Sequence, residues 1–103
     1  NGVQYPDYTA PDACSIAKAS VDASHNSAVI NVGAYDKQSR ILYYAYSTDG
    51  GLTYSQKLVW SGTNANYVVP ITVKLDGKQN CPVQFIVWNN FDEYTVSNMI
   101  TVN

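Results

Sequence analysis

The sequence predicts an all-β fold of about seven short strands, and three observations carry this prediction. Only 14% of the 103 residues are charged, whereas Tyr alone occurs 9 times and Val, Thr, Ser and Asn are frequent. These residue types suit half-buried pleated sheets more than helices. Turn-forming residues recur roughly every ten positions, and between them apolar and polar residues alternate with the period of a strand. No segment shows a helical period, so we expect no long helix.

The length and the charge limit both the architecture and the partners. A chain of 103 residues accommodates one domain with one core. Its net charge is −2 and it has no cluster of Lys and Arg, so we expect no nucleic acid partner, whose phosphates require several grouped cations. No apolar run reaches the length of a membrane span, and we expect no membrane partner. The chain starts at Asn1 without a signal-peptide pattern, which indicates a mature or excised piece of a longer protein.

Residues 1–13 are expected to form a linker or N-terminal extension, and residues 14–103 the module itself. The first segment contains two prolines and shows no strand period, which is typical of a linker between domains. Tyr5 and Tyr8 are expected to hold it against the body. The strand that follows, residues 15–21, is diluted by alanine, serine and a lysine, so we expect it at a sheet edge.

The next strand and the hairpin after it form the centre of the predicted fold. Residues 28–34 alternate apolar with small or polar side chains, which predicts a strand that packs one face on the core. Residues 40–60, RILYYAYSTDGGLTYSQKLVW, consist of two apolar arms around a Ser-Thr-Asp-Gly-Gly tip. This is the pattern of a β-hairpin, because Gly50 and Gly51 can adopt the positive φ that a tight turn between strands requires.

Three further strands complete the predicted fold. Residues 67–74 alternate, and they contain Pro70, which lacks a ladder donor and places this strand at an edge. Residues 83–88 and 94–102 form a final hairpin around the turn Asn-Asn-Phe-Asp-Glu. Seven short strands with short connections predict an immunoglobulin-like Greek-key β-sandwich. A propeller is excluded by size, because it needs several four-stranded blades.

The hairpin tip also fits a short motif, the Asp box, which reads Ser-x-Asp-x-Gly-x-Thr-aromatic. Ser47, Asp49, Gly51, Thr53 and Tyr54 occupy its positions, with tyrosine where tryptophan is more usual. In the families that carry it the box is a folding device. We therefore expect the Asp49 side chain to cap its own turn.

The aromatic strand, the S-x-DGG-x-T-Y tip, the segment QFIVWNN and the closing SNMITV together resemble the immunoglobulin-like and fibronectin-III-like modules of bacterial secreted multidomain proteins. The resemblance covers residues 15–103 and implies the β-sandwich fold. It implies little about function, because this fold carries many unrelated sites. One turn departs from the pattern: many such modules have a short Gly-Asn turn between the last two strands, whereas residues 89–93 are polar and acidic with one aromatic.

Cys14 and Cys81 leave two alternatives. An even number of cysteines in a chain of extracellular character favours a disulfide. In an immunoglobulin-type topology, however, the first and sixth strands begin at opposite ends of the sandwich, about 20 Å apart. The Cα atoms of a disulfide lie within about 7 Å. Either the first strand departs from the expected topology, or both thiols are free.

The titratable residues form no catalytic or metal-binding pattern, so we expect neither an enzyme nor a metal or other cofactor. The only histidine, His25, lies in a polar turn, where a nucleophilic triad would depend on a flexible loop residue. Asp92 and Glu93 are adjacent, and turn carboxylates are usually just solvated. The same tip, with Asn89 and Asn90, offers oxygen atoms to calcium but lacks the D-x-D-x-D spacing.

The informative anomaly is the outward face of two strands that neighbour each other in an immunoglobulin-type sheet. If Leu42, Tyr44 and Tyr46 point into the core, alternation places apolar side chains on the solvent side as well. The outward side chains expected from the two strands are Ile41, Tyr43, Ala45, Gln84, Ile86 and Trp88. Two alternatives remain: the first segment folds over this face, or Trp88 is a core residue and the register is one position out.

Rigid aromatic side chains on a flat sheet, surrounded by Asn, Gln and Ser, are typical of a carbohydrate-binding surface, because sugar rings stack on them while amides read the hydroxyls. We therefore expect a non-catalytic, extracellular, monomeric module that binds polysaccharide and has neighbouring domains in the same chain. The expected ligand-binding residues are Tyr43, Trp88, Gln84, Asn89, Asn90 and, if its side chain points outward, Trp60. The alternative is a structural spacer or protein-binding adhesin domain of a modular secreted protein.

Overall fold

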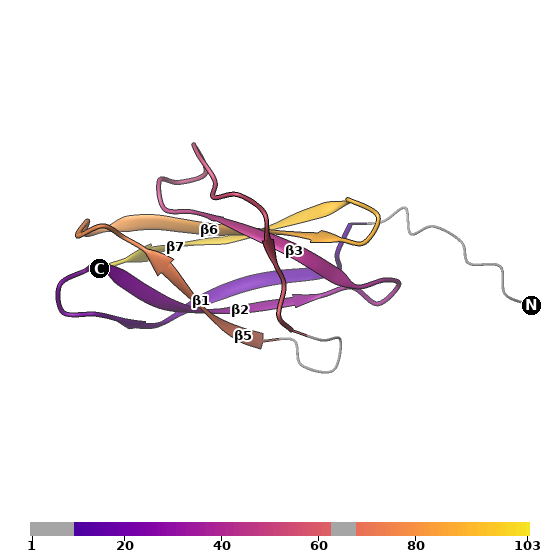
Figure 1. Cartoon of the computed structure of the whole chain (residues 1–103), viewed down its shortest axis with the longest axis horizontal. Helices are drawn as coiled ribbons and strands as arrows, with labels where there is room; N and C mark the ends of the chain where they lie inside the picture. Colours follow the sequence, from indigo (N-terminus) through magenta and orange to yellow (C-terminus); the bar gives the residue numbers. More distant parts are fainter. Residues whose placement is uncertain (1–9, 63–67) are drawn as a thin grey trace, which may run out of the picture.

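The computed structural model describes residues 10–62 and 68–103, and within these ranges the chain forms seven β-strands and no helix. The strands are β1 (Ala13–Val21), β2 (Ser27–Tyr35), β3 (Ile41–Ser47), β4 (Leu58–Val59), β5 (Val68–Lys74), β6 (Cys81–Asn89) and β7 (Tyr94–Val102). The predicted all-β character is confirmed (Figure 1). Residues 1–9 of the expected linker and Tyr67 of the expected fifth strand lie outside the described residues. A helix long and apolar enough to cross a membrane is not found in the described ranges.

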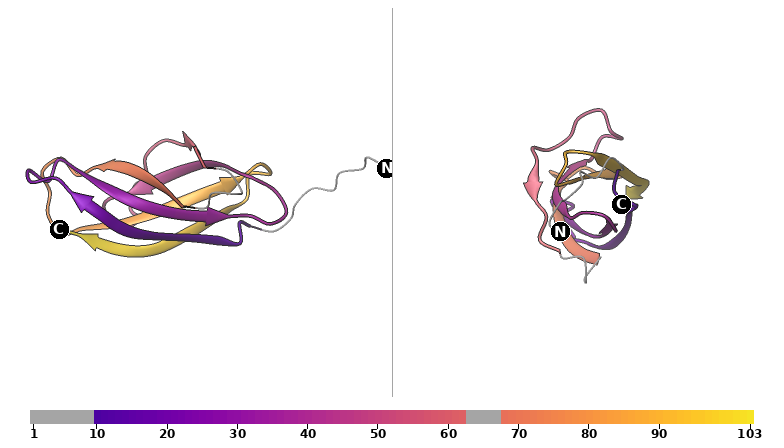
Figure 2. Two further views of the ribbon diagram at one scale, coloured as in Figure 1. Left: turned by 90° about the horizontal axis from the view of Figure 1, so that it is seen from below. Right: turned by 90° about the vertical axis from the view of Figure 1, so that its right-hand side faces the viewer.

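The strands form two antiparallel sheets that lie face to face. One sheet has the strand order β1-β2-β5, and the other has the order β4-β3-β6-β7. The end-on view in Figure 2 shows both sheets curved around a common interior. β3 and β6 are neighbours in one sheet, as the sequence predicts, and their register places Tyr43 opposite Trp88.

The core lies between the two sheets and is formed by every second residue of the central strands. Burial of each large apolar side chain contributes about 1.5–3 kcal/mol, so this alternation decides which face of a strand points outward. On β3, the rings of Tyr44 and Tyr46 lie with their centroids 6.0 Å and 5.7 Å from that of Phe85. Their predicted inward orientation is therefore confirmed. The apolar side chains with no exposed surface in the described ranges are Ile30, Val32, Val73, Val83, Phe85, Val87 and Val102.

Trp60 belongs to this core and not to the outer face. Its side chain is only 7% exposed, and it packs edge-to-face on Tyr44 with ring centroids 6.1 Å apart. The Trp60 amide donates to the Leu42 carbonyl at 2.8 Å, directly after the two-residue strand β4. The expectation that Trp60 extends an outer aromatic surface is therefore wrong, because the chain turns its side chain inward as soon as β4 ends.

A register shift between Ile41 and Tyr43 changes the outward set expected on β3. Ile41, which strict alternation places on the solvent side, is buried in the core cluster. Ala45 is buried as well, but it lies outside that cluster, opposite Ile86. Of the three side chains expected outward on β3, only Tyr43 is exposed.

One side chain joins the edge strands β1 and β7, which lie side by side. Asn98 accepts a hydrogen bond from the Ile16 amide at 2.8 Å and donates one to the Ile16 carbonyl at 3.2 Å. The register of β6 and β7 shifts here, and the Phe85 amide donates to the Ser97 hydroxyl at 2.9 Å. Thr95 adds a bond to the Pro11 carbonyl at 2.8 Å. These contacts close the β1–β7 side of the fold.

Both cysteines are free thiols, so the disulfide alternative is wrong. Cys14 pairs with Ala34, close to the end of the module where Asp36 contacts Asn89, the last residue of β6. Cys81 is the first residue of the same 9-residue strand. A strand of this length spans about 26 Å at about 3.3 Å per residue, so the two thiols lie at opposite ends of the fold.

Candidate functional site

The outer face of the β4-β3-β6-β7 sheet carries one row of large side chains that crosses all its strands. Val59 lies opposite Tyr43, Tyr43 opposite Trp88 and Trp88 opposite Tyr94. Cross-strand partners share one face of a sheet, and neighbouring strands are about 4.8 Å apart. Tyr43 and Tyr94 are 38% and 57% exposed, and Trp88 is half-buried. The structure thus brings Tyr43 and Trp88 together, as the sequence predicts, and adds Tyr94.

Two further rows extend this surface along β6 and β7. Ile86 lies opposite Val96, and Gln84 lies opposite Met99. Val96 and Met99 are exposed, although strand side chains that face solvent are usually polar. Exposed apolar side chains grouped on one sheet face are typical of interaction sites. We refer to it as the aromatic face, which consists of Tyr43, Val59, Ile86, Trp88, Tyr94, Val96 and Met99.

The alternation on β6 shows that Trp88 belongs to this outer face. Val83, Phe85 and Val87 have no exposed surface, whereas Trp88 and the two outward residues before it are half-buried. The alternative in which Trp88 is a core residue and the register is one position out is therefore wrong. The other alternative, a first segment folded over the face, involves residues 1–9, which lie outside the described residues.

The outer face of the β1-β2-β5 sheet provides an internal comparison. Most of its exposed side chains are small or polar, as expected for a solvated sheet face. The apolar character of the aromatic face is therefore a property of one side of the module and not of its whole surface. The exposed residues of the comparison face include Ala13, Ser15, Ala17, Ser20, Asn31, Val68, Pro70, Thr72 and Lys74.

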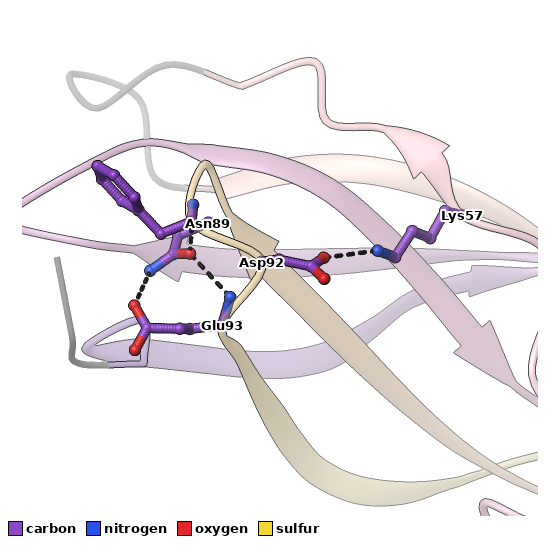
Figure 3. Close-up of polar contacts among 5 residues, drawn as sticks. Lys57, Asn89, Asp92 and Glu93 are labelled. Carbon is purple, nitrogen blue, oxygen red and sulfur yellow. Dashed lines mark hydrogen bonds and ion pairs between the residues drawn. The ribbon is translucent and has the colours of Figure 1, made fainter. Parts of the chain in front are cut away.

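An ion pair lies across the aromatic face. The Lys57 ammonium nitrogen is 4.5 Å from the ring centroid of Trp88 and 5.7 Å from that of Tyr43, within the range of cation–π attraction. The same nitrogen donates to Asp92 Oδ1 at 2.9 Å, and Figure 3 shows the two side chains extended toward each other. Lys57 directly precedes β4, and Asp92 lies in the β6–β7 turn. The pair therefore links two segments that flank the aromatic row.

Sequence reasoning missed Tyr94, Lys57 and Asp92 as parts of this site. The position of Tyr94 follows from the hairpin register, because Trp88 and Tyr94 are paired on either side of a short turn. That signal was available in the sequence. Lys57 and Asp92 are 35 positions apart, and no local pattern joins them.

Two of the amide side chains expected to hydrogen-bond sugar hydroxyls, those of Gln84 and Asn90, already form hydrogen bonds within the fold. Gln84 accepts a hydrogen bond from the Tyr54 hydroxyl at 3.0 Å and donates one to the Ser97 carbonyl at 3.0 Å. Asn90 is exposed, but its side-chain oxygen accepts from the Arg40 amide at 3.1 Å. Gln84 thus lies within the face with its amide already bonded, and Asn90 connects the β6–β7 turn to the start of β3.

Asn89, the third amide residue expected to bind sugar hydroxyls, is a buried structural residue. Its amide nitrogen donates to Asp36 at 3.2 Å and to Glu93 at 3.3 Å, and its oxygen accepts from the backbone amides of Phe91 and Glu93 at 2.9 Å and 3.0 Å. Figure 3 shows the contacts between Asn89 and Glu93. Because the side chain is 1% exposed, Asn89 holds the turn together and is not placed to contact a ligand.

The Asp-box residues form a hydrogen-bonded turn at the β3 end of the sheet. The Ser47 hydroxyl donates to Asp49 Oδ1 at 2.6 Å and accepts from the Gly51 amide at 2.8 Å. The Thr53 amide donates to Asp49 Oδ1 at 2.9 Å, and the Thr53 hydroxyl donates to Asp49 Oδ2. Hydrogen bonds from the Ser47 hydroxyl, and then from Thr53, hold the pKa of Asp49 well below its usual range.

Backbone geometry confirms the positive φ predicted for the two glycines, whereas the second arm of the expected hairpin is shortened to the two-residue strand β4, well beyond the turn. Gly50 and Gly51 have φ values of 77° and 90°, which residues other than glycine rarely adopt. Tyr54, the aromatic residue of the box, connects the turn to Gln84 on β6. The box therefore acts as the folding device that the sequence predicts.

The described residues contain no group of three or more His, Cys, Asp or Glu side chains that could hold a metal ion. No pocket is found in the same ranges, and the candidate site is an open surface. The chain matches no protein-family model, no curated protein and no solved structure in the comparisons.

Proposed function

We propose that this chain is a non-catalytic carbohydrate-binding module that holds polysaccharide on the aromatic face. The observation that carries the proposal is the row of Tyr43, Trp88 and Tyr94 on three neighbouring strands, with all three rings on the solvent side. Strand spacing of about 4.8 Å is close to the length of one sugar ring in an extended chain. Successive rings of such a chain can therefore lie over successive strands.

Stacking accounts for weak but useful binding. An aromatic ring presents an apolar face to the C–H groups of a pyranose, and each such contact contributes about 1 kcal/mol. Two or three contacts therefore contribute about 2–3 kcal/mol, which corresponds to a dissociation constant on the order of 10 mM. Such weak binding suits a module that is tethered to others and gains from avidity. We therefore also propose an extracellular, monomeric module with neighbouring domains in the same chain.

The strand order supports an immunoglobulin-like Greek-key assignment, which is part of the proposal. β1, β2 and β5 correspond to the A, B and E strands of that fold, and β3, β6 and β7 correspond to C, F and G. The short strand β4 takes the place of C′, next to β3. In this assignment the aromatic face lies on the sheet that contains C, F and G.

A second candidate function, docking of a neighbouring domain or another protein, is favoured by a different part of the same face. Val59, Val96 and Met99 are exposed aliphatic side chains, and such side chains are more typical of protein interfaces than of sugar contacts. In this reading the module is a spacer or an adhesin domain. The two functions differ in which residues bind: the aromatic row or the aliphatic flank.

Affinity electrophoresis separates them. The wild type, Trp88→Ala, Tyr94→Ala and the double variant Val96→Ser/Met99→Ser are run in gels that contain soluble glucans, mannans, xylans or pectins. We expect one or more glycans to retard the wild type and the Val96/Met99 variant alike, and the two aromatic variants much less. If no glycan retards the wild type, or if all variants are retarded equally, carbohydrate binding on this face is wrong and domain docking becomes the better explanation. Equal melting temperatures show that the variants are folded.

A further inference from the structure

We propose that Lys57 and Asp92 are the groups that read sugar hydroxyls on the aromatic face, and that the ligand is a neutral polysaccharide. This inference rests on the proposed function, and it names the polar part of the same site. An aromatic surface alone holds a sugar loosely, because stacking discriminates poorly between sugars. Recognition needs a few convergent polar groups beside the rings.

The position of the ion pair fits this role. Its ammonium lies above the ring of Trp88 at 4.5 Å from the centroid, and its carboxylate accepts from that ammonium at 2.9 Å. A donor and an acceptor are therefore adjacent at one edge of the aromatic row. Two neighbouring hydroxyls of one sugar ring present the matching acceptor and donor, since a hydroxyl group does both.

Both side chains retain unused hydrogen-bonding capacity. The Lys57 ammonium has three donors and the Asp92 carboxylate about four acceptor sites. Within the described residues, the one side-chain hydrogen bond of each group is the bond between them. Both remain open to solvent, with 43% and 80% of the side chain exposed. The amides predicted to bind hydroxyls differ. Asn89 is buried with two donated and two accepted hydrogen bonds inside the fold, and Gln84 has one donor and one acceptor engaged there.

The charge of the pair selects the class of ligand. The charges of the Lys57 ammonium and the Asp92 carboxylate cancel, because Lys57 Nζ lies 2.9 Å from Asp92 Oδ1. This part of the face therefore carries no net charge. The carboxylate of an acidic sugar would compete with Asp92 for Lys57 and would leave one of two anions unpaired. The chain as a whole has a net charge of −2, which also disfavours a polyanion. A neutral glycan meets neither obstacle.

The test measures dissociation constants from affinity electrophoresis over a series of glycan concentrations, with neutral glucan, mannan and xylan against polygalacturonate. The variants are Lys57→Met, which keeps the aliphatic stem, and Asp92→Asn. Asp92 has a φ of 64°, and Asn tolerates this left-handed conformation. The matched controls are Lys78→Met, on the β5–β6 turn, and Asp76→Asn, an exposed aspartate with a φ of 55°.

We expect a neutral glycan to bind, and Lys57→Met and Asp92→Asn each to weaken its binding by about tenfold, the value of one hydrogen bond to a charged group. The two controls should bind as the wild type does. If wild type binds a neutral glycan and both site variants bind it equally well, the reader assignment is wrong while the proposed function stands. Tighter binding by Lys57→Met would show that the lysine only covers Trp88, and it would overturn the assignment. Preference for polygalacturonate overturns the neutral ligand, and binding of no glycan at all overturns the proposed function together with this inference.

Discussion

The side chain of Asn98 makes two hydrogen bonds to one residue of another strand, as its oxygen accepts from the Ile16 amide at 2.8 Å and its nitrogen donates to the Ile16 carbonyl at 3.2 Å. An asparagine amide presents the same donor and acceptor as a peptide group. Asn98 thus takes the place of a strand neighbour for Ile16. It satisfies backbone groups of an edge strand that would otherwise be open to another chain.

We predict that Asn98→Ala lowers the free energy of unfolding by about 1–2 kcal/mol, because two hydrogen bonds are lost and the Ile16 backbone loses its partner. Urea unfolding followed by tyrosine and tryptophan fluorescence measures the change. The matched control is Asn31→Ala, at an exposed asparagine of β2, for which we expect a change below about 0.5 kcal/mol. Equal stability of Asn98→Ala and wild type would contradict the role of the Asn98 side chain.

Replacement of Gly51 tests the Asp-box turn. Gly51 has a φ of 90°, and a Cβ there would lie 3.1 Å from Gln84 Oε1. We therefore predict that Gly51→Val lowers the free energy of unfolding by about 1–3 kcal/mol. Affinity for glycan should be unchanged in the molecules that still fold.

Gly77→Val is the control for that substitution. Gly77 has a φ of 79°, but no heavy atom lies within 4 Å of a Cβ at this position. This variant should show the backbone strain without the crowding, and it should destabilise less than Gly51→Val. Selective loss of glycan binding in Gly51→Val at an unchanged melting temperature would instead make the turn part of the site.

The low pKa of Asp49 predicts a contribution to stability that depends on pH. The folded-state pKa lies below the unfolded value, so the contribution is present above about pH 4 and is lost as the pH falls from there toward the folded pKa. Asp49→Asn lacks this titration. We expect the stability of the wild type to fall more steeply than that of Asp49→Asn between about pH 5 and about pH 2, a range that begins about one unit above the ordinary aspartate pKa and extends toward the lowered pKa of Asp49. Parallel curves from urea unfolding would show that the Asp49 hydrogen bonds contribute no pH-dependent stability.

The two thiols, of which Cys14 is half-buried and Cys81 buried, should react slowly in the folded protein. Burial raises the pKa of Cys14 to about 12, and the thiolate is the reactive form; Cys81 is buried. We predict that both thiols react very slowly with a disulfide reagent at pH 8 in the native state, and at once in denaturant without any reductant. Absence of free thiols in denaturant would contradict the unpaired state of the cysteines.

The parts of the fold that depend on local pattern were predictable from the sequence. Val83, Phe85 and Val87 alternate with their outward neighbours, and the two glycines of the Asp-box tip require positive φ. Both signals lie within a few residues of each other. The neighbourhood of Tyr43 and Trp88 then followed from the expectation that β3 and β6 share a sheet.

The remaining features depend on departures from regular pairing or on distant residues. The inward turn of Trp60 depends on where the two-residue strand β4 ends, and the burial of Ile41 depends on a register shift. The alternation of apolar and polar residues in the sequence predicts neither the inward turn of Trp60 nor the burial of Ile41. The contact between Lys57 and Asp92 needs three strands to be in place before the two side chains meet, and for this reason the polar part of the candidate site was not predicted.

The bond between Asn98 and Ile16 also has a mechanical consequence. β1 begins at the end of the fold where Pro11 meets Thr95, near the start of β7, whereas Val102 closes β7 beside Cys81 at the opposite end. The two terminal strands therefore run in the same direction, side by side (Figure 1). When residues 13 and 102 are pulled apart, β1 and β7 slide past each other lengthwise, and their contacts are loaded together in shear. Asn98, which is hydrogen-bonded to both backbone groups of Ile16, therefore lies between the two strands that would bear a tensile force first.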